Sequence, residues 1–300
     1  MKLLELFTSL LSEDLKKLLN IPTKQTKKCV EENSELLMLA EQGDINAQYK
    51  LGVQLMSEEK YKEAHIWLEK VSIGKPEAYG FLAMLYSAGL GCPIDKKKAW
   101  DLAITAEQKG SLLGVAIQGR WYKLGDGIKA NTEKAFKLLE KVVYSISDEY
   151  YKIGFQWILG LYADELIRRN KTLDAIKWAN KGVTYKDCAS YVILGSLYLT
   201  GNGVNQDVEM AIQYLKQAIS KSNPPKDYID LAYAALGDIY SAKGDLKNAL
   251  SNIRKAAELG NAVCMHTMSL AYRNGRGVIK DMDKAIEWEQ KAIAAGYIAQ

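Results

Sequence analysis

The sequence is poor in several residue types, and their scarcity narrows the possible functions. Histidine occurs twice and proline five times in 300 residues, and the four cysteines (Cys29, Cys92, Cys188 and Cys264) form no C-x-x-C pair. Isolated cysteines argue against a disulfide framework or a zinc site and indicate free thiols in a reducing compartment. Because Gly-x-Ser-x-Gly and His-Glu-x-x-His motifs are also missing, we predict neither a catalytic residue nor a metal site.

Charge and hydropathy exclude two further classes of partner. The net charge is only +4, and the basic residues are scattered among acidic ones, so we predict no nucleic-acid partner. No apolar run is long enough to span a membrane, so membrane insertion is not predicted either. The first 19 residues are amphipathic, but Glu5, Glu13 and Asp14 interrupt them and no small-residue cleavage site follows. We therefore expect a helix there rather than a signal peptide, and a cytoplasmic location.

Alanines that open an apolar helical pattern recur along the chain at nearly constant spacing. Successive members lie 35, 36, 40, 36, 38 and 36 residues apart. A period of this size is typical of repeat proteins in which each unit is one pair of helices, and the plentiful Ala, Leu, Lys and Glu favour helix over strand. The seven alanines are Ala64, Ala99, Ala135, Ala175, Ala211, Ala249 and Ala285.

A small residue flanked by apolar ones precedes each alanine, usually with an aromatic residue three positions later. Small and large side chains one turn apart suit two closely packed helices. The small residue lies 12 positions before the alanine in three units, 16 in three others, and 17 in the third unit, where Gln118 takes its place. The seven anchor residues are Gly52, Ala83, Gln118, Ala163, Gly195, Gly237 and Ser269.

The longer units contain an inserted Gly-x-Gly turn, such as Gly275-Arg276-Gly277. The first glycine can end a helix in the left-handed conformation, and the second keeps the turn free of a side-chain clash. The Asp or Asn four residues before the alanine can cap the second helix. Because nucleotide-binding loops need a third glycine in register or a Gly-Lys-Ser/Thr sequence, we interpret these turns as structural and predict no cofactor.

The segments from Leu194 to Ala218 and from Leu270 to Ala292 resemble the Sel-1-like repeat, a subclass of the tetratricopeptide repeat superfamily. The three units with 12-residue spacing resemble plain tetratricopeptide repeats. The resemblance implies an all-α fold, a right-handed α-α superhelical solenoid of about seven helix-turn-helix repeats with an N-terminal capping helix. We predict that residues 1–34 form this capping helix and a linker, and that residues 35–300 form the solenoid.

The resemblance implies a protein-protein interaction scaffold, such as a bacterial adaptor, that binds another protein or peptide in its concave groove. Two alternatives stay open: an immunity protein that neutralises a secreted toxin and, from another class, an enzyme or the regulatory arm of one. The apolar last helix leaves a homodimer through the C-terminus possible.

The groove is expected to be lined by first helices, at fixed offsets from the small residue. The residue types found there, which include Tyr, Trp, Arg and Met, are those enriched at interfaces. The predicted groove residues are Asn46, Tyr49, Met56, Glu77, Met84, Tyr122, Lys123, Trp157, Asp164, Arg168, Ser196, Thr200, Asp238, His266, Arg273 and Asn274.

Overall fold

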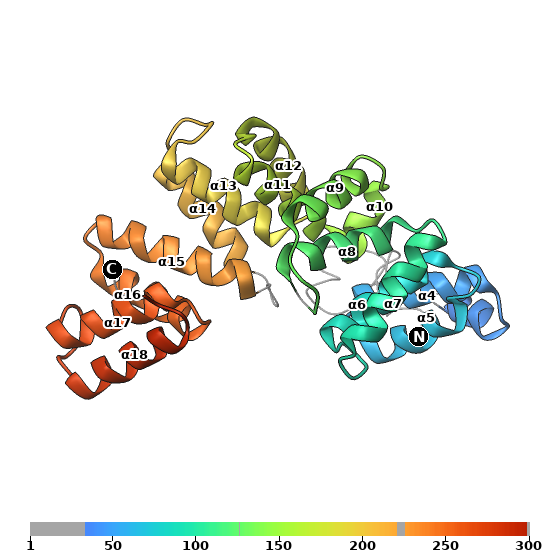
Figure 1. The fold of residues 1–300 in the computed structure, drawn as a ribbon, viewed down its shortest axis with the longest axis horizontal. Coiled ribbons are helices and arrows are strands. Elements are labelled where there is room, and N and C mark those ends of the chain that lie inside the picture. The colour runs from blue at the N-terminus through green and yellow to red at the C-terminus, as the bar shows by residue number, and fades with distance from the viewer. Residues whose placement is uncertain (1–33, 126, 221–225, 299–300) are drawn as a thin grey trace, which may run out of the picture. The chain divides into compact units, whose positions relative to one another are not determined.

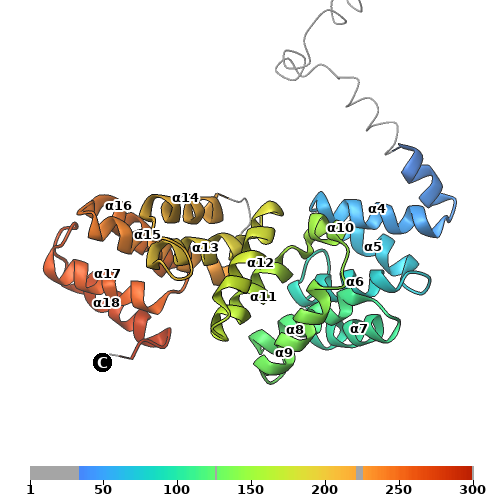
Figure 2. The ribbon, with the colours of Figure 1, turned by 90° about the horizontal axis from the view of Figure 1, so that it is seen from above.

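The described part of the chain is helical throughout, as seen in a computed structural model that describes residues 34–125, 127–220 and 226–298 (Figures 1 and 2). No strand occurs in these ranges. The predicted capping helix and Cys29 lie outside them. The chain divides into two compact units, residues 1–118 and residues 119–300, and each is described by itself.

The described helices of the first unit begin with residues 34–41, which precede two helix pairs. These pairs are α4 (Ile45–Ser57) with α5 (Tyr61–Val71) and α6 (Pro76–Ala88) with α7 (Lys96–Gln108). The unit boundary falls within α8 (Leu112–Leu124).

The second unit continues the same arrangement of paired helices. A short α10 (Asp148–Tyr150) and a π-helical turn, η1 (Tyr151–Phe155), precede the fourth pair, and these extra residues account for the longest alanine spacing. The other helices are α9 (Thr132–Val143), α11 (Trp157–Arg168), α12 (Thr172–Thr184), α13 (Cys188–Thr200), α14 (Val208–Ile219), α15 (Lys226–Ala242), α16 (Leu246–Glu258), α17 (Ala262–Asn274) and α18 (Met282–Ala294).

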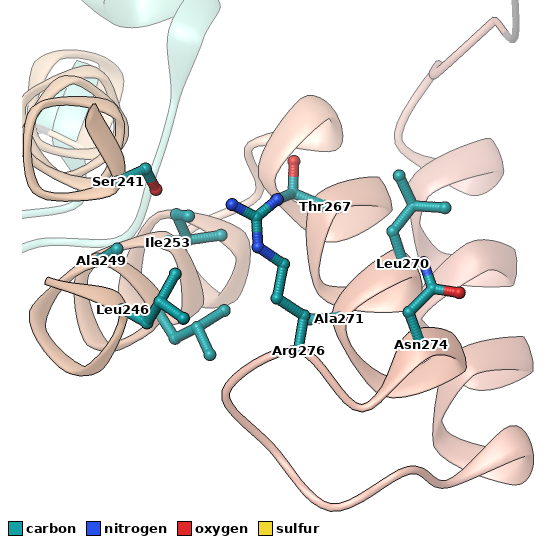
Figure 3. A pocket seen from close by; sticks show the side chains of 10 residues that line it. Ser241, Leu246, Ala249, Ile253, Thr267, Leu270, Ala271, Asn274 and Arg276 are labelled. Atoms are coloured by element: carbon teal, nitrogen blue, oxygen red, sulfur yellow. The ribbon is translucent and has the colours of Figure 1, made fainter. Parts of the chain in front are cut away.

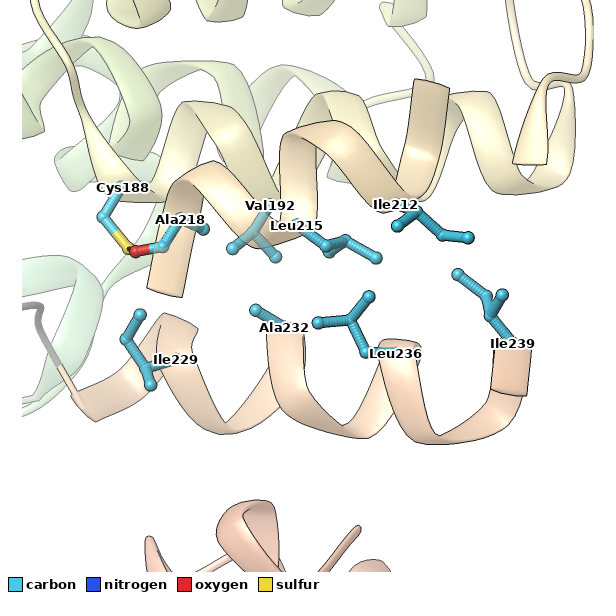
Figure 4. Packing of buried hydrophobic residues seen from close by; sticks show 9 residues of the cluster. All are labelled: Cys188, Val192, Ile212, Leu215, Ala218, Ile229, Ala232, Leu236 and Ile239. Atoms are coloured by element: carbon cyan, nitrogen blue, oxygen red, sulfur yellow. Dashed lines mark hydrogen bonds between the residues drawn. The ribbon is translucent and has the colours of Figure 1, made fainter. Parts of the chain in front are cut away.

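The seven repeat alanines all lie in the core, as the sequence predicted. Each sits in the second helix of its pair and is at most 1% exposed. Consecutive pairs stack on one another as in a repeat solenoid. Figure 4 shows one such layer, in which Leu236 and Ile239 of α15 point toward Leu215 and Ile212 of α14. At the other end of the layer, Ile229 points toward Cys188 and Ala218. Because a single pair leaves one apolar face open, stacking buries apolar surface that an isolated pair would expose to water.

The inserted turns have the predicted caps. Gly89, Gly201 and Gly275 end their helices in the left-handed conformation, with φ between 68° and 70°. The side chains of the capping residues accept hydrogen bonds of 2.9–3.0 Å from the backbone N–H three residues later. Such a cap stabilises a helix by about 1 kcal/mol. The four capping residues are Asp95, Asn131, Asp207 and Asp281.

The second glycine of the turn lies directly against the preceding pair. A Cβ atom on Gly91 would lie 2.4 Å from the backbone carbon of Tyr61, and one on Gly277 would lie 2.4 Å from the Leu250 side chain. At these two turns the sequence prediction of a glycine required by close approach is therefore confirmed, and each of the two turns packs closely against the preceding helix pair.

The three described cysteines are free, with Cys188 and Cys264 buried and Cys92 half-buried. Burial raises the pKa of Cys264 to about 11. Because the thiolate is the reactive form, we expect Cys264 to resist iodoacetamide at pH 8 while the chain is folded. Cys92 should react first, and both should react in concentrated urea. Peptide mapping by mass spectrometry checks this order, and fast labelling of Cys264 in the folded chain would contradict it.

Candidate protein-binding site

The predicted groove residues all lie on first helices. They occupy α4 (Asn46, Tyr49, Met56), α6 (Glu77, Met84), α8 (Tyr122, Lys123), α11 (Trp157, Asp164, Arg168), α13 (Ser196, Thr200), α15 (Asp238) and α17 (His266, Arg273, Asn274). As whole residues fifteen of them are exposed or half-buried, although the side chain of Lys123 is only 7% exposed. Met56 is the exception: it is 6% exposed and packs in the core, so its assignment to a binding surface is wrong.

The anchor of the third pair is Gly119 rather than Gln118. A Cβ atom on Gly119 would lie 3.1 Å from Leu139, just as one on Gly52 would lie 2.9 Å from Leu68. This one-residue correction restores the 16-residue spacing to Ala135. Gln118 is also buried, but its side-chain amide bonds to Glu107 at 2.7 Å.

The corrected register moves Tyr122 to the tyrosine position of the repeat. Lys134 donates a 2.7 Å hydrogen bond to its hydroxyl and lies 4.2 Å from its ring centre. Lys98 contacts Tyr86 in the same way, at 2.5 Å and 4.1 Å. The lysine before the repeat alanine thus joins the two helices of a pair by a hydrogen bond and a cation–π contact.

Three predicted groove residues meet in one ion-pair cluster between α8 and α11. Lys123 Nζ lies 2.7 Å from Asp164 and 2.5 Å from Glu165, and Arg168 lies 3.3 Å from Asp164. The Lys123 side chain is only 7% exposed and that of Glu165 only 1%. Arg169 adds a 2.9 Å contact to Glu165. Each carboxylate has a cationic partner, which is the arrangement of a structural network.

Sequence reasoning missed Glu165 and Arg169 and placed Lys123 on the surface. From the sequence alone, an acidic residue in a first helix is expected to face solvent. The partner of Glu165 is Lys123, which lies 42 residues earlier in the chain. The signal available was the Asp164-Glu165 pair within an otherwise apolar segment of α11.

Trp157 begins α11 directly after the π-helical turn. Its ring lies 5.9 Å from Phe155 and 5.5 Å from the Arg120 guanidinium. The Nε1 atom is buried and has no hydrogen-bond partner among the described residues. Trp157 therefore belongs to the packed junction before the fourth pair, where the residue is half-buried.

His266 on α17 is held by two neighbours. Its Nδ1 lies 2.8 Å from Glu289, and its ring stacks on Tyr297 with centroids 4.3 Å apart. Nearby, α18 exposes Ile286 and Ile293, which are 48% and 61% accessible. The sequence analysis allowed a homodimer to form through this C-terminal helix, and that homodimer stays a prediction.

A pocket of about 180 Å³ lies between α15, α16 and α17 (Figure 3). Leu246, Leu250 and Ile253 form one wall, and Figure 3 shows the guanidinium of Arg276 reaching toward Thr267. The other lining residues are Ser241, Ala249, Leu270, Ala271 and Asn274, the last of which is the single predicted groove residue among them. The sequence signal for this pocket is the arginine inside the Gly-x-Gly turn, where the other three turns carry Leu90, Asp126 and Asn202.

The described residues, 34–125, 127–220 and 226–298, offer neither a metal-binding cluster nor a membrane-spanning helix. Within them, no three His, Cys, Asp or Glu side chains gather closely enough to hold a metal ion. No helix in the same ranges combines the length and the hydropathy that crossing a membrane requires.

A family model, the Sel1 repeat, matches most of the chain. It covers residues 45–70, 76–111, 112–141, 189–223, 228–261 and 262–297. These six segments coincide with six of the seven helix pairs. The pair it omits is α11 with α12, which follows the π-helical turn and carries Asp164 and Glu165.

Solved structures of Sel1 proteins share the fold. A Sel1 repeat protein from Oxalobacter formigenes is 25% identical with a TM-score of 0.57, covering 82% of this chain and 99% of that one. The protective antigen c5321 of uropathogenic Escherichia coli, which has an SLR fold, is 24% identical with a TM-score of 0.51, covering 95% of this chain and 64% of that one.

A curated relative is the chitin synthase regulator SKT5 of Saccharomyces cerevisiae. It is 24% identical over 318 residues, which include 89% of this chain and 44% of the relative. The chain therefore spans less than half the length of this relative.

Proposed function

The chain belongs to the Sel1 repeat family, and from this premise we propose that it is a non-catalytic scaffold that binds a partner protein along its first helices. The relationship to a protein named as a regulator of an enzyme supports a role of this kind. A cytoplasmic location is part of the proposal.

One observation carries the proposal. The residue after the small anchor is never buried, although the anchor before it is buried in all seven pairs. At this constant position the chemistry varies widely, from apolar to acidic to basic, which is typical of a surface that binds a partner. Asp164 takes part in the structural ion-pair cluster as well. The seven residues are Val53, Met84, Arg120, Asp164, Ser196, Asp238 and Leu270.

The test is a quantitative pull-down with the full chain as bait and mass spectrometry as readout. We expect Ser196→Arg combined with Asp238→Arg to lower recovery of the specific partners by about tenfold or more, since introduced like charges and lost contacts each cost a kcal/mol or more at an interface. Both residues are exposed on first helices, so circular dichroism should show an unchanged helix content.

The matched control makes the same chemical changes on second helices. Asp101→Arg on α7 and Ser251→Arg on α16 alter exposed residues and the same total charge. This variant should retain the partners. Equal recovery by both variants, or equal loss, would contradict binding along the first helices.

A further inference from the structure

The pocket beneath Arg276 has properties that specify a ligand. Its volume of about 180 Å³ lies below that of pockets for drug-sized ligands and close to that of an apolar cavity that holds one benzene ring. It therefore has room for a single large side chain. Leu246 and Leu270 remain 37% and 39% exposed at this site, so apolar surface is available to a ligand.

Arg276 is the single charged residue that lines the pocket. No ion pair is recorded for it within the described residues. A lone guanidinium beside an apolar cavity is complementary to one carboxylate, because a phosphate carries nearly two charges and usually gathers several cationic donors. The polar side chains of Ser241, Thr267 and Asn274 line the same pocket without adding charge.

The backbone around Arg276 is fixed before any ligand arrives. The N–H of Arg276 donates a 3.0 Å bond to Ala271, and Asp281 N–H donates one of 3.0 Å to Tyr272. Gly277 lies against Leu250, as described above. The turn therefore holds the stem of Arg276 beside the apolar wall, and a ligand has little backbone ordering to impose.

We propose that this pocket binds a segment of the partner in which a large apolar side chain, such as leucine, stands next to an aspartate or glutamate. The apolar side chain enters between α16 and α17, and the carboxylate pairs with the Arg276 guanidinium. This inference rests on the proposed scaffold function and deepens it by naming what one part of the surface recognises.

The test uses a blocked peptide, acetyl-Ser-Gly-Leu-Glu-Gly-Ser-amide, titrated into the full chain with methyl-labelled leucines. We expect the methyl signals of Leu246, Leu250 and Leu270 to shift, with half-saturation near about 1 mM, as suits one side chain and one ion pair. Replacing the peptide's glutamate by glutamine should weaken binding about tenfold, and replacing its leucine by alanine at least about tenfold.

Two variants of the chain test whether Arg276 is the residue that pairs with the glutamate of the peptide. Arg276→Gln should reduce binding of the Leu-Glu peptide to that of the Leu-Gln peptide and leave the latter unchanged. Lys280→Gln removes an exposed positive charge four residues further along the chain, at a residue that neither lines the pocket nor belongs to the predicted groove, and should leave both unchanged. Equal effects of the two variants would show that binding depends on the overall positive charge of the surface and not on Arg276, which would overturn the proposal.

The other possible outcomes of the titration also test the proposal. Indifference to the peptide's glutamate, or shifts confined to other leucines, would overturn the proposal. Shifts of the same signals with protein concentration alone would place a second copy in the pocket and overturn it as well. Partner capture that is sensitive to Ser196→Arg with Asp238→Arg, in a chain that ignores the peptide, would remove this inference and leave the scaffold function standing.

Discussion

Lys123→Met should lower the free energy of unfolding by about 3 kcal/mol or more, because it removes the cation shared by Asp164 and Glu165. Glu165 is fully buried and would keep Arg169 at 2.9 Å and, more distantly, Arg168 at 3.9 Å as cationic partners. Removing one member of a buried ion pair typically costs about 3–5 kcal/mol, since the remaining charge cannot regain its hydration. Urea unfolding followed by circular dichroism measures the change.

The control is Lys137→Met, which removes a lysine whose side chain is 72% exposed and 3.9 Å from Glu133. A surface pair of this kind contributes little, so the loss should stay within about 0.5 kcal/mol. Combining Lys123→Met with Glu165→Leu should recover part of the stability, because apolar replacement removes both buried charges together. A Lys123→Met variant as stable as the Lys137→Met control would show that the cluster does not hold α8 to α11.

Gly91→Ala should destabilise the chain by about 3 kcal/mol. Alanine in the left-handed conformation costs about 1–2 kcal/mol, and here φ is +71°. The new Cβ would in addition lie 2.4 Å from the backbone of Tyr61, so the turn must move off the preceding pair. Overpacking of this type typically adds about 1–3 kcal/mol.

Gly110→Ala separates the two causes. Gly110 also has a positive φ, of +86°, but a Cβ atom there would meet nothing within 4 Å. Its substitution should cost only the conformational part, about 1–2 kcal/mol, in the same urea titration. Identical losses for the two variants would mean that the contact with Tyr61 contributes nothing.

The fold could be predicted because the same helix-pair pattern occurs in the sequence several times. A single buried alanine carries little information, but seven at similar spacing do, and all seven are buried in the structure. The helix caps could be predicted as well, because the side chains of Asp207 and Asp281 bond to backbone N–H groups only three residues away.

The errors arose where neighbouring residues compete or where partners lie far apart in sequence. Gln118 and Gly119 are both buried, and only the contact with Leu139 identifies Gly119 as the anchor. Met56 has the offset of an exposed residue but lies in the core of the first described pair. The Lys123–Glu165 pair joins residues 42 positions apart, which no local pattern records.

The position after each anchor has an evolutionary consequence. Because it is never buried, its side chain can change at pairs such as those of Ser196 and Asp238 without altering the packing of the layer beneath, whereas Asp164 is tied into the ion-pair cluster. In the proposed scaffold, substitutions at this position would therefore change which partners bind at each helix pair while the fold stays the same. Duplication of a helix pair would add one more such position to the proposed binding surface.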